Sequence, residues 1–180
     1  FGQRIFTSKE AMELEKQPKR LAIIGGGYIG LEFAGMFNSF GTHVTIFDQH
    51  TRLLEREDPD IATEVVADLT DAGIEIKPAT QLTQVKDNGE KVTLYYQQGD
   101  QSNTAEFDAV LVAVGRRPNI NSLGLENTDI ALTSRGAIQV DDHLRTTVQN
   151  VWALGDVNGG PMFTYVSLDD FRIIVDQLFD

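Results

Sequence analysis

The sequence has no cysteine among its 180 residues, and this absence limits the chemistry open to the chain. Without thiols a protein forms no disulfide, holds no metal through thiolate and has no thiol nucleophile. An extracellular disulfide scaffold is therefore excluded, and we expect a cytoplasmic protein with no metal site. Any redox chemistry must come from a cofactor or from another part of a larger protein.

Basic side chains are also scarce. Fifteen Lys and Arg stand against 27 Asp and Glu, which gives a formal net charge of −12. Proteins that bind nucleic acid or anionic membrane surfaces need a cationic face, so we expect neither partner. No apolar run approaches the roughly 20 residues that span a bilayer. With 41% hydrophobic and 23% charged residues, the composition is that of a globular protein with a buried core.

Short apolar runs, typical of buried parallel strands, alternate with helical spacings in the first part of the chain. Asp58 followed by Pro59 is typical of a helix N-cap and first turn. The expected strands are residues 21–24, 44–47 and 74–76, and the expected helices are residues 29–40 and 59–72. Strands and helices in this order predict an α/β fold with a Rossmann-like doubly wound parallel sheet.

The pattern changes after residue 80. Segments that alternate polar and apolar side chains are separated by turn signals at Asn88-Gly89 and Gly99-Asp100. They predict an antiparallel β-meander, inserted where a crossover helix would otherwise stand. Buried strands are expected again at residues 109–114 and 151–154, with a loop-rich stretch between them and a partly helical tail.

Gly25, Gly27 and Gly30 form a GxGxxG pattern between an expected strand and an expected helix. In dinucleotide-binding folds the first glycine allows a tight turn, the second lets the backbone approach a pyrophosphate, and the third lets helix and strand pack closely. The helix N-terminus then offers N–H groups and the positive end of its dipole to the pyrophosphate. A merely tight strand-to-helix turn is the alternative interpretation.

Asp48 ends the second expected strand, 48 − 30 = 18 residues after the last glycine of the pattern. An acid about 20 residues beyond the glycines binds the ribose hydroxyls of NAD in such folds. A carboxylate there accepts hydrogen bonds from a free 2′-hydroxyl and repels a 2′-phosphate, which favours NADH. Arg52 is either a solvated surface charge or a guanidinium that holds a 2′-phosphate, so NADPH stays open as the alternative.

Two further residues follow expected strands. Gly115 ends the strand at residues 109–114, where ligands bind in open α/β sheets, and would let the backbone approach a nucleotide. Asp156 follows residues 151–154 and would accept a hydrogen bond from a ligand hydroxyl. A strand terminator and a turn cap are the respective alternatives.

Three segments, GGGYIGLEFAG, VLVAVGRRPN and VWALGDVNGGP, occur in an order and spacing that resembles a family of FAD-dependent enzymes. These are the pyridine nucleotide–disulfide oxidoreductases, which include glutathione, dihydrolipoamide and mercuric reductases. The resemblance runs from about residue 8 to residue 161. It implies that residues 1–150 form an NAD(P)-binding domain and that residues 151–180 are an incomplete returning segment of the FAD-binding domain.

The resemblance also implies roles for individual residues. Tyr28 matches the tyrosine that shields the flavin until the nicotinamide displaces it, and Glu32 matches an acid that pairs with a lysine near the flavin. Asp156 matches the acid that hydrogen-bonds the ribityl chain of FAD. Ile29, inside the glycine turn, is grouped with the cofactor-binding residues. Ordinary interface packing and a solvated helix position are the alternatives for Tyr28 and Glu32.

The tail, GGPMFTYVSLDDFRIIVDQL, is similar to the mercuric-reductase-like branch, and most of all to bacterial reactive-chlorine-resistance flavoproteins that reduce hypothiocyanous acid. By this resemblance the whole protein is a homodimer that passes hydride from NAD(P)H to FAD and on to a cysteine pair. This chain would hold the nucleotide site alone, bind NAD(H) weakly and show no reductase turnover. A mercuric or dihydrolipoamide reductase is the alternative within the family. A stand-alone nucleotide-sensing module or a single-domain dehydrogenase is the alternative outside it.

Overall fold

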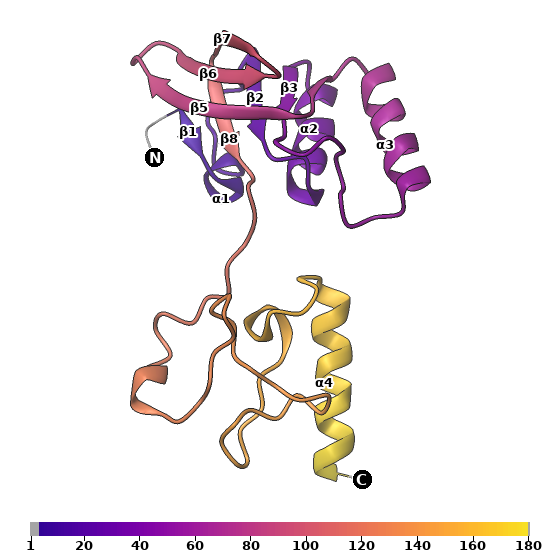
Figure 1. Ribbon diagram of the computed structural model, residues 1–180, viewed down its shortest axis with the longest axis vertical. Helices are drawn as coiled ribbons and strands as arrows, with labels where there is room; N and C mark the ends of the chain where they lie inside the picture. The colour runs from indigo at the N-terminus through magenta and orange to yellow at the C-terminus, as the bar shows by residue number, and fades with distance from the viewer. Residues whose placement is uncertain (1–3, 180) are drawn as a thin grey trace. The chain divides into compact units, whose positions relative to one another are not determined.

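The computed structural model describes residues 4–179 of the chain (Figure 1). The described residues fall into two compact units that divide between Gly115 and Arg116. The sequence-based boundary at residue 150 concerns the two cofactor domains of a larger protein, so it stays a prediction.

The first unit is built on a five-stranded sheet in the order β1-β8-β2-β3-β4, and every pairing in it is parallel. The strands are β1 (Ile5–Phe6), β2 (Arg20–Ile24), β3 (His43–Phe47), β4 (Glu75–Lys77) and β8 (Ala109–Val112). The helices are α1 (Ser8–Ala11), α2 (Tyr28–Ser39) and α3 (Pro59–Asp71). The predicted Rossmann-like sheet is confirmed. The pair β1 and α1 is an addition that the sequence patterns did not indicate.

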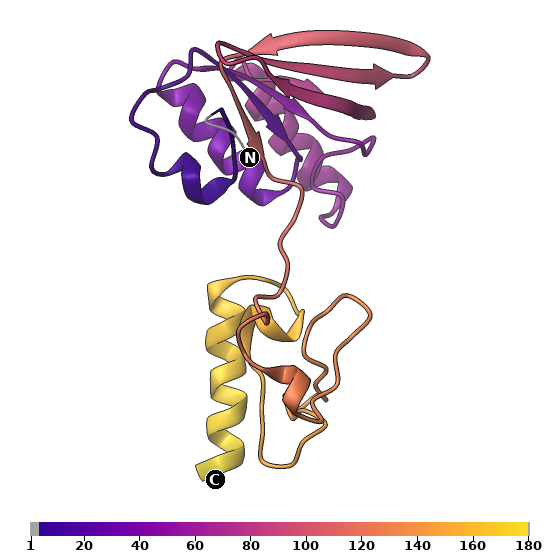
Figure 2. The same ribbon diagram turned by 90° about the vertical axis from the view of Figure 1, so that its left-hand side faces the viewer.

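The two faces of this sheet are covered differently, because successive side chains of a strand point to opposite sides. Leu21 and Ile23 of β2 belong to the core that the helices cover. Ala22, between them, packs into a second core with the predicted meander. The meander consists of β5 (Thr80–Asp87), β6 (Val92–Gln98) and β7 (Gln101–Phe107), which pair antiparallel. Figure 2 shows these layers, with an antiparallel sheet where a second helical layer would stand.

The order of the parallel strands creates a switch point beside β2. From β2 the chain proceeds outward to β3 and β4, and it later returns to β8 on the other side of β2. In open α/β sheets, ligands bind at the carboxyl ends of the strands where the strand order reverses. The ends of β2 and β8, followed by Gly25 and Ala113, therefore mark the expected ligand crevice.

The second unit contains little regular structure besides α4 (Thr164–Phe179) and the 3₁₀ helices η1 (Leu125–Asn127) and η2 (Gly155–Asn158). The predicted strand at residues 151–154 is wrong. The only pairing there, within residues 4–179, is an isolated bridge between Arg145 and Trp152. An apolar run signals burial, but a strand also needs a hydrogen-bonding neighbour along its length, and Leu154 is already 41% exposed.

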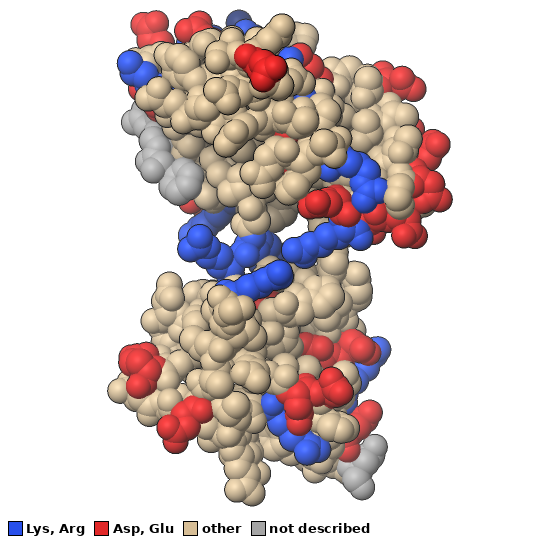
Figure 3. Space-filling view, in the orientation of Figure 1, with Lys and Arg blue, Asp and Glu red and all other residues tan. Residues whose placement is uncertain are grey.

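Acidic side chains gather over α3 and the loop before it (Figure 3). Asp58 occupies the N-cap position of α3 and Pro59 its first turn, as predicted, although the Asp58 side chain makes no capping hydrogen bond. Across residues 4–179 we find no helix with the length and hydrophobicity that crossing a membrane requires.

Candidate dinucleotide site

The glycine turn between β2 and α2 has the close packing that a GxGxxG pattern predicts. Gly25 has a φ of +110°, and a Cβ there would lie 2.4 Å from the Ala113 carbonyl oxygen after β8. A Cβ on Gly30 would lie 2.0 Å from the Gly25 carbonyl oxygen, so this glycine lets α2 approach the turn. Both structural expectations for these glycines are confirmed.

Gly27 differs from its neighbours, because a Cβ there would meet no atom within 4 Å. It is the N-cap of α2, where no side chain provides a capping hydrogen bond and no acidic residue stands in the first turn. A helix N-terminus left open in this way attracts anions through its N–H groups and its dipole. The surroundings of Gly27 therefore fit a pyrophosphate group.

Asp48 follows β3 and contacts the glycine turn directly. Its Oδ2 accepts a hydrogen bond from the Gly26 backbone N–H at 2.5 Å. Its Oδ1 accepts one from the His50 N–H at 2.8 Å and lies 2.8 Å from His50 Nδ1. The Asp48 side chain is only 10% exposed. The sequence predicts a contact between this acid and the ribose, and the structure adds a contact to the turn that would hold the pyrophosphate.

Arg52 lies in the loop after β3, and its guanidinium turns toward that loop. Its Nη2 donates to the carbonyl oxygens of Glu55 at 2.9 Å and Glu57 at 3.2 Å. His50, which the sequence interpretation left without a role, lies between two acids, with Nε2 3.4 Å from Glu55 Oε2. The imidazole of His50 thus lies between the carboxylates of Asp48 and Glu55.

Tyr28 is the first residue of α2 and is 43% exposed. Its hydroxyl donates a hydrogen bond to the Glu57 carboxylate in the loop after β3. Ile29 beside it is half-buried, and Glu32 one turn later is exposed. Glu32 forms no ion pair within residues 4–179, and the lysine that the family resemblance implies for it is expected outside this chain.

The remaining predicted residues lie on either side of the division between the units. Gly115 is exposed, has a φ of +125° and has open space around its Cβ position. Asp156 lies in η2 of the second unit, where its Oδ2 pairs with Arg116 Nη2 at 2.9 Å. The Asp156 side chain is 38% exposed.

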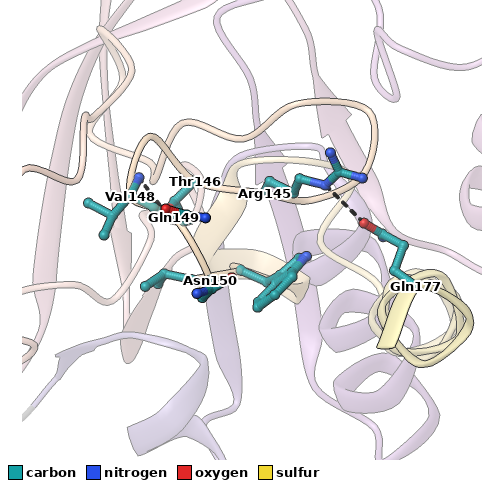
Figure 4. Close-up of a pocket in the computed structure, with 8 residues that line it drawn as sticks. Arg145, Thr146, Val148, Gln149, Asn150 and Gln177 are labelled. Carbon is teal, nitrogen blue, oxygen red and sulfur yellow. Dashed lines mark hydrogen bonds between the residues drawn. The ribbon is translucent and has the colours of Figure 1, made fainter. Parts of the chain in front are cut away.

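A pocket in the second unit contains none of the predicted residues. It lies where Gln177 of α4 accepts a hydrogen bond from Arg145 Nε at 3.1 Å (Figure 4). The indole Nε1 of Trp152, in the same lining, is buried without a hydrogen-bond partner in the described part of the chain. Residues 4–179 also hold no cluster of three or more His, Asp or Glu side chains suited to a metal ion.

Gly26, His50 and Glu57 of the site in the first unit escaped the sequence interpretation, and so did Arg116 beside Asp156 in the second unit. Gly26 carried a signal, since it is the middle of three successive glycines where the pattern requires only the outer two. His50 belongs to no motif, and the partners of Glu57 and Arg116 lie 29 and 40 residues away along the chain.

A parallel sheet with a glycine turn at its switch point and an acid on the next strand defines a dinucleotide-binding fold. Residues 1–170 match the pyridine nucleotide-disulphide oxidoreductase family, and the chain belongs to it. This confirms the resemblance drawn from the three sequence segments. The family depends on flavin and pyridine nucleotide.

Among curated relatives, the chain is 42% identical to the probable pyridine nucleotide-disulfide oxidoreductase RclA of Escherichia coli K12, over 97% of this chain and 38% of that protein. It is 35% identical to a mercuric reductase of Staphylococcus aureus, over 95% of this chain and 31% of that protein. It is 38% identical to a dihydrolipoyl dehydrogenase of Geobacillus stearothermophilus, over 99% of this chain and 38% of that protein.

Two solved structures resemble this chain over nearly its whole length. The HOCl-induced flavoprotein disulfide reductase RclA of Escherichia coli superposes with a TM-score of 0.90 at 41% identity, over 99% of this chain and 40% of that one. LpdA of Mycobacterium tuberculosis gives a TM-score of 0.88 at 27% identity, over 99% of this chain and 38% of that one. The chain thus spans well under half the length of these relatives.

Proposed function

We propose that this chain is the NAD(P)H-binding part of a flavoprotein oxidoreductase. The observation that carries the proposal is the open N-terminus of α2 at Gly27, next to the switch point of the parallel sheet. The N–H groups there would bind the pyrophosphate, Asp48 would accept the ribose hydroxyls, and Gly115 would let the backbone after β8 approach the nucleotide.

We further propose that the site prefers NADH to NADPH. Arg52, the one cation that the sequence offered to a 2′-phosphate, donates its Nη2 to carbonyl oxygens of its own loop. Asp48, Glu55 and Glu57 bring three carboxylates to the same region, and a phosphate dianion there would meet like charge. A free 2′-hydroxyl would instead donate a hydrogen bond to Asp48.

In the whole protein, residues 1–150 would form the NAD(P)-binding domain and residues 151–180 a returning segment of the FAD-binding domain. Tyr28 would cover the nicotinamide position and Glu32 would pair with a lysine beyond this chain. Asp156 would hold the ribityl chain, with Arg116 fixing its carboxylate. Bound flavin would supply the hydride acceptor, and a cysteine pair outside this chain would receive the electrons.

The substrate proposal rests on similarity. Because RclA is described as HOCl-induced and is 41–42% identical to this chain, we propose that the whole protein reduces hypothiocyanous acid or a related oxidant as a cytoplasmic homodimer. The mercuric reductases and dihydrolipoyl dehydrogenases, at 35% and 38% identity, keep these two activities as the alternatives.

A substitution at Gly27 tests nucleotide binding. Gly27→Asp introduces a carboxylate at the N-terminus of α2 without a steric clash, because no atom lies within 4 Å of the new Cβ. We expect the chain to bind NADH in a saturable manner and Gly27→Asp to lose at least about tenfold in affinity, since the new charge repels a pyrophosphate. Gly35→Asp adds the same charge late in α2, also in open space, and should leave the affinity nearly unchanged. Equal affinities in all three proteins would contradict the proposal.

A further inference from the structure

Both backbone groups of Gly26, in the glycine turn, form hydrogen bonds to residues that follow β3. The Gly26 N–H donates to Asp48 Oδ2 at 2.5 Å, and the Gly26 carbonyl oxygen accepts from the Leu54 N–H at 3.1 Å. Leu53, 2% exposed, packs so closely that a Cβ on Gly26 would lie 2.4 Å from its Cγ. Gly26 is therefore fixed by its two backbone groups and has no space for a side chain.

Asp48 is itself rigidly held. Its backbone N–H donates to the Lys77 carbonyl oxygen at 3.1 Å, and its carbonyl oxygen accepts from the Thr80 N–H at 2.8 Å. These bonds tie Asp48 to the end of β4 and the start of β5. The His50 N–H donates to Oδ1, which leaves Oδ2 to accept the hydrogen bond from Gly26.

The position of Gly26 decides where the neighbouring N–H groups point. Gly27, the next residue, is the N-cap of α2 and begins the surface that would receive the pyrophosphate. A charge-assisted hydrogen bond to a backbone N–H is roughly twice as strong as a neutral one, so it orients the peptide that it binds. Preorganised donors bind an anion with less loss of conformational entropy.

We propose that Asp48 is a positioning residue for the glycine turn, in addition to any contact with the ribose, so that it supports pyrophosphate binding through Gly26. This inference rests on the proposed function in naming the dinucleotide, whereas the hydrogen bond to Gly26 exists without any ligand. A ligand without the ribose hydroxyls distinguishes the two roles of Asp48, because only the positioning role can then affect its binding.

The first test uses NMR of the full chain without nucleotide. A short hydrogen bond to a carboxylate shifts the Gly26 amide proton downfield, and we expect Asp48→Asn, which keeps the shape and an acceptor oxygen but loses the charge, to move this resonance upfield. Asp68→Asn on the exposed face of α3 is the matched control and should leave it in place. A Gly26 resonance that stays unmoved in Asp48→Asn overturns the proposal.

The second test compares NADH with an NADH analogue that lacks both hydroxyls of the adenosine ribose, the 2′,3′-dideoxy analogue. A ribose contact alone would make Asp48→Asn weaken NADH binding and leave binding of this analogue unchanged. We expect Asp48→Asn to weaken binding of the dideoxy analogue as well, by about fivefold, the equivalent of one net hydrogen bond. Equal affinities of the wild type and Asp48→Asn for the dideoxy analogue would overturn the proposal. Absence of any NADH binding by the wild type would instead refute the proposed function, and the NMR result would then decide the positioning role by itself.

Discussion

Two glycines of α2 provide a direct comparison at the scale of single residues. Gly30 faces the Gly25 carbonyl oxygen, which would lie 2.0 Å from a Cβ, whereas Gly35 has no atom within 4 Å of that position. We expect Gly30→Ala to lower the free energy of unfolding by about 2 kcal/mol, because backbone must move to admit the methyl group. Gly35→Ala should raise it by about 0.5–1 kcal/mol through better helix propensity. Urea unfolding followed by circular dichroism measures both, and equal effects would contradict the packing described for Gly30.

The sequence left two interpretations of Arg52 open, a solvated surface charge or a guanidinium that holds a 2′-phosphate. Its guanidinium binds the carbonyl oxygens of Glu55 and Glu57, so it stabilises its own loop. We expect Arg52→Ala to change the affinities for NADH and NADPH by the same factor, within about twofold, because neither depends on a contact to a 2′-phosphate. Titration of both nucleotides checks this, and a selective loss of NADPH binding would show that Arg52 recognises the phosphate.

Tyr28 and Glu57 form a pair whose coupling is measurable. The Tyr28 hydroxyl donates to the Glu57 carboxylate across the loop after β3. In a double-mutant cycle with Tyr28→Phe and Glu57→Gln, we expect the two effects on NADH affinity to be non-additive, because either substitution weakens the same hydrogen bond. Strict additivity would indicate that the pair plays no part in nucleotide binding.

At the scale of elements, Asp108 links the ends of four strands. It stands between β7 and β8, its Oδ2 accepts from the Arg20 N–H at the start of β2 at 2.7 Å, and its Oδ1 pairs with Lys91 before β6. The Lys91 ammonium, followed by the Arg20 N–H, lowers the pKa of the Asp108 carboxyl below its ordinary value. The folded state therefore binds this proton less readily than the unfolded state does.

The lowered pKa of Asp108 makes the free energy of unfolding depend on pH. A carboxyl with a lowered pKa stabilises the fold fully above its unfolded pKa of about 4, and the stabilisation disappears as the pH falls through the lower folded value. We expect Asp108→Asn to be less stable than the wild type at pH 7, with a difference that shrinks as the pH falls below about 4. Urea unfolding across this range measures it. A difference that does not vary with pH would contradict the assigned role of the Lys91 and Arg20 contacts.

Elements were predictable from the sequence where a local pattern determines them. The runs at residues 21–24 and 44–47 became β2 and β3, and the alternating segments became the meander. The two-residue strand β1 was too short to show a pattern, and the strand expected at residues 151–154 lacks a partner strand. Burial can be inferred from composition along the chain, whereas pairing depends on segments far away in it.

The candidate site, too, was predictable from the sequence only where a local pattern determines it. The roles of Gly25 and Gly30 follow from a spacing that is local, and both were predicted. The bond between Gly26 and Asp48 joins residues 22 positions apart, and no spacing rule reveals it. The pairs of Tyr28 with Glu57 and of Arg116 with Asp156 are non-local as well, so only the folded structure identifies them.

For the whole molecule, the division into two compact units predicts which part of the chain determines the affinity for the nucleotide. The glycine turn, Asp48, Arg52 and Gly115 all belong to the first unit, which ends at Gly115. We expect a chain of residues 1–115 to bind NADH within about threefold of the affinity of the 180-residue chain, a difference below 1 kcal/mol. Calorimetric titration of both proteins checks this, and loss of binding in the shorter chain would place essential contacts after Gly115.

The most direct measurement is a calorimetric titration of NADH and of NADPH into the full chain at neutral pH. The open helix N-terminus at Gly27 and the carboxylates around Asp48 predict saturable binding of one NADH per chain, with NADPH at least about tenfold weaker. Failure of both nucleotides to saturate at millimolar concentration would contradict a dinucleotide site. Tighter binding of NADPH than of NADH would contradict the role given to Asp48 and its neighbouring acids.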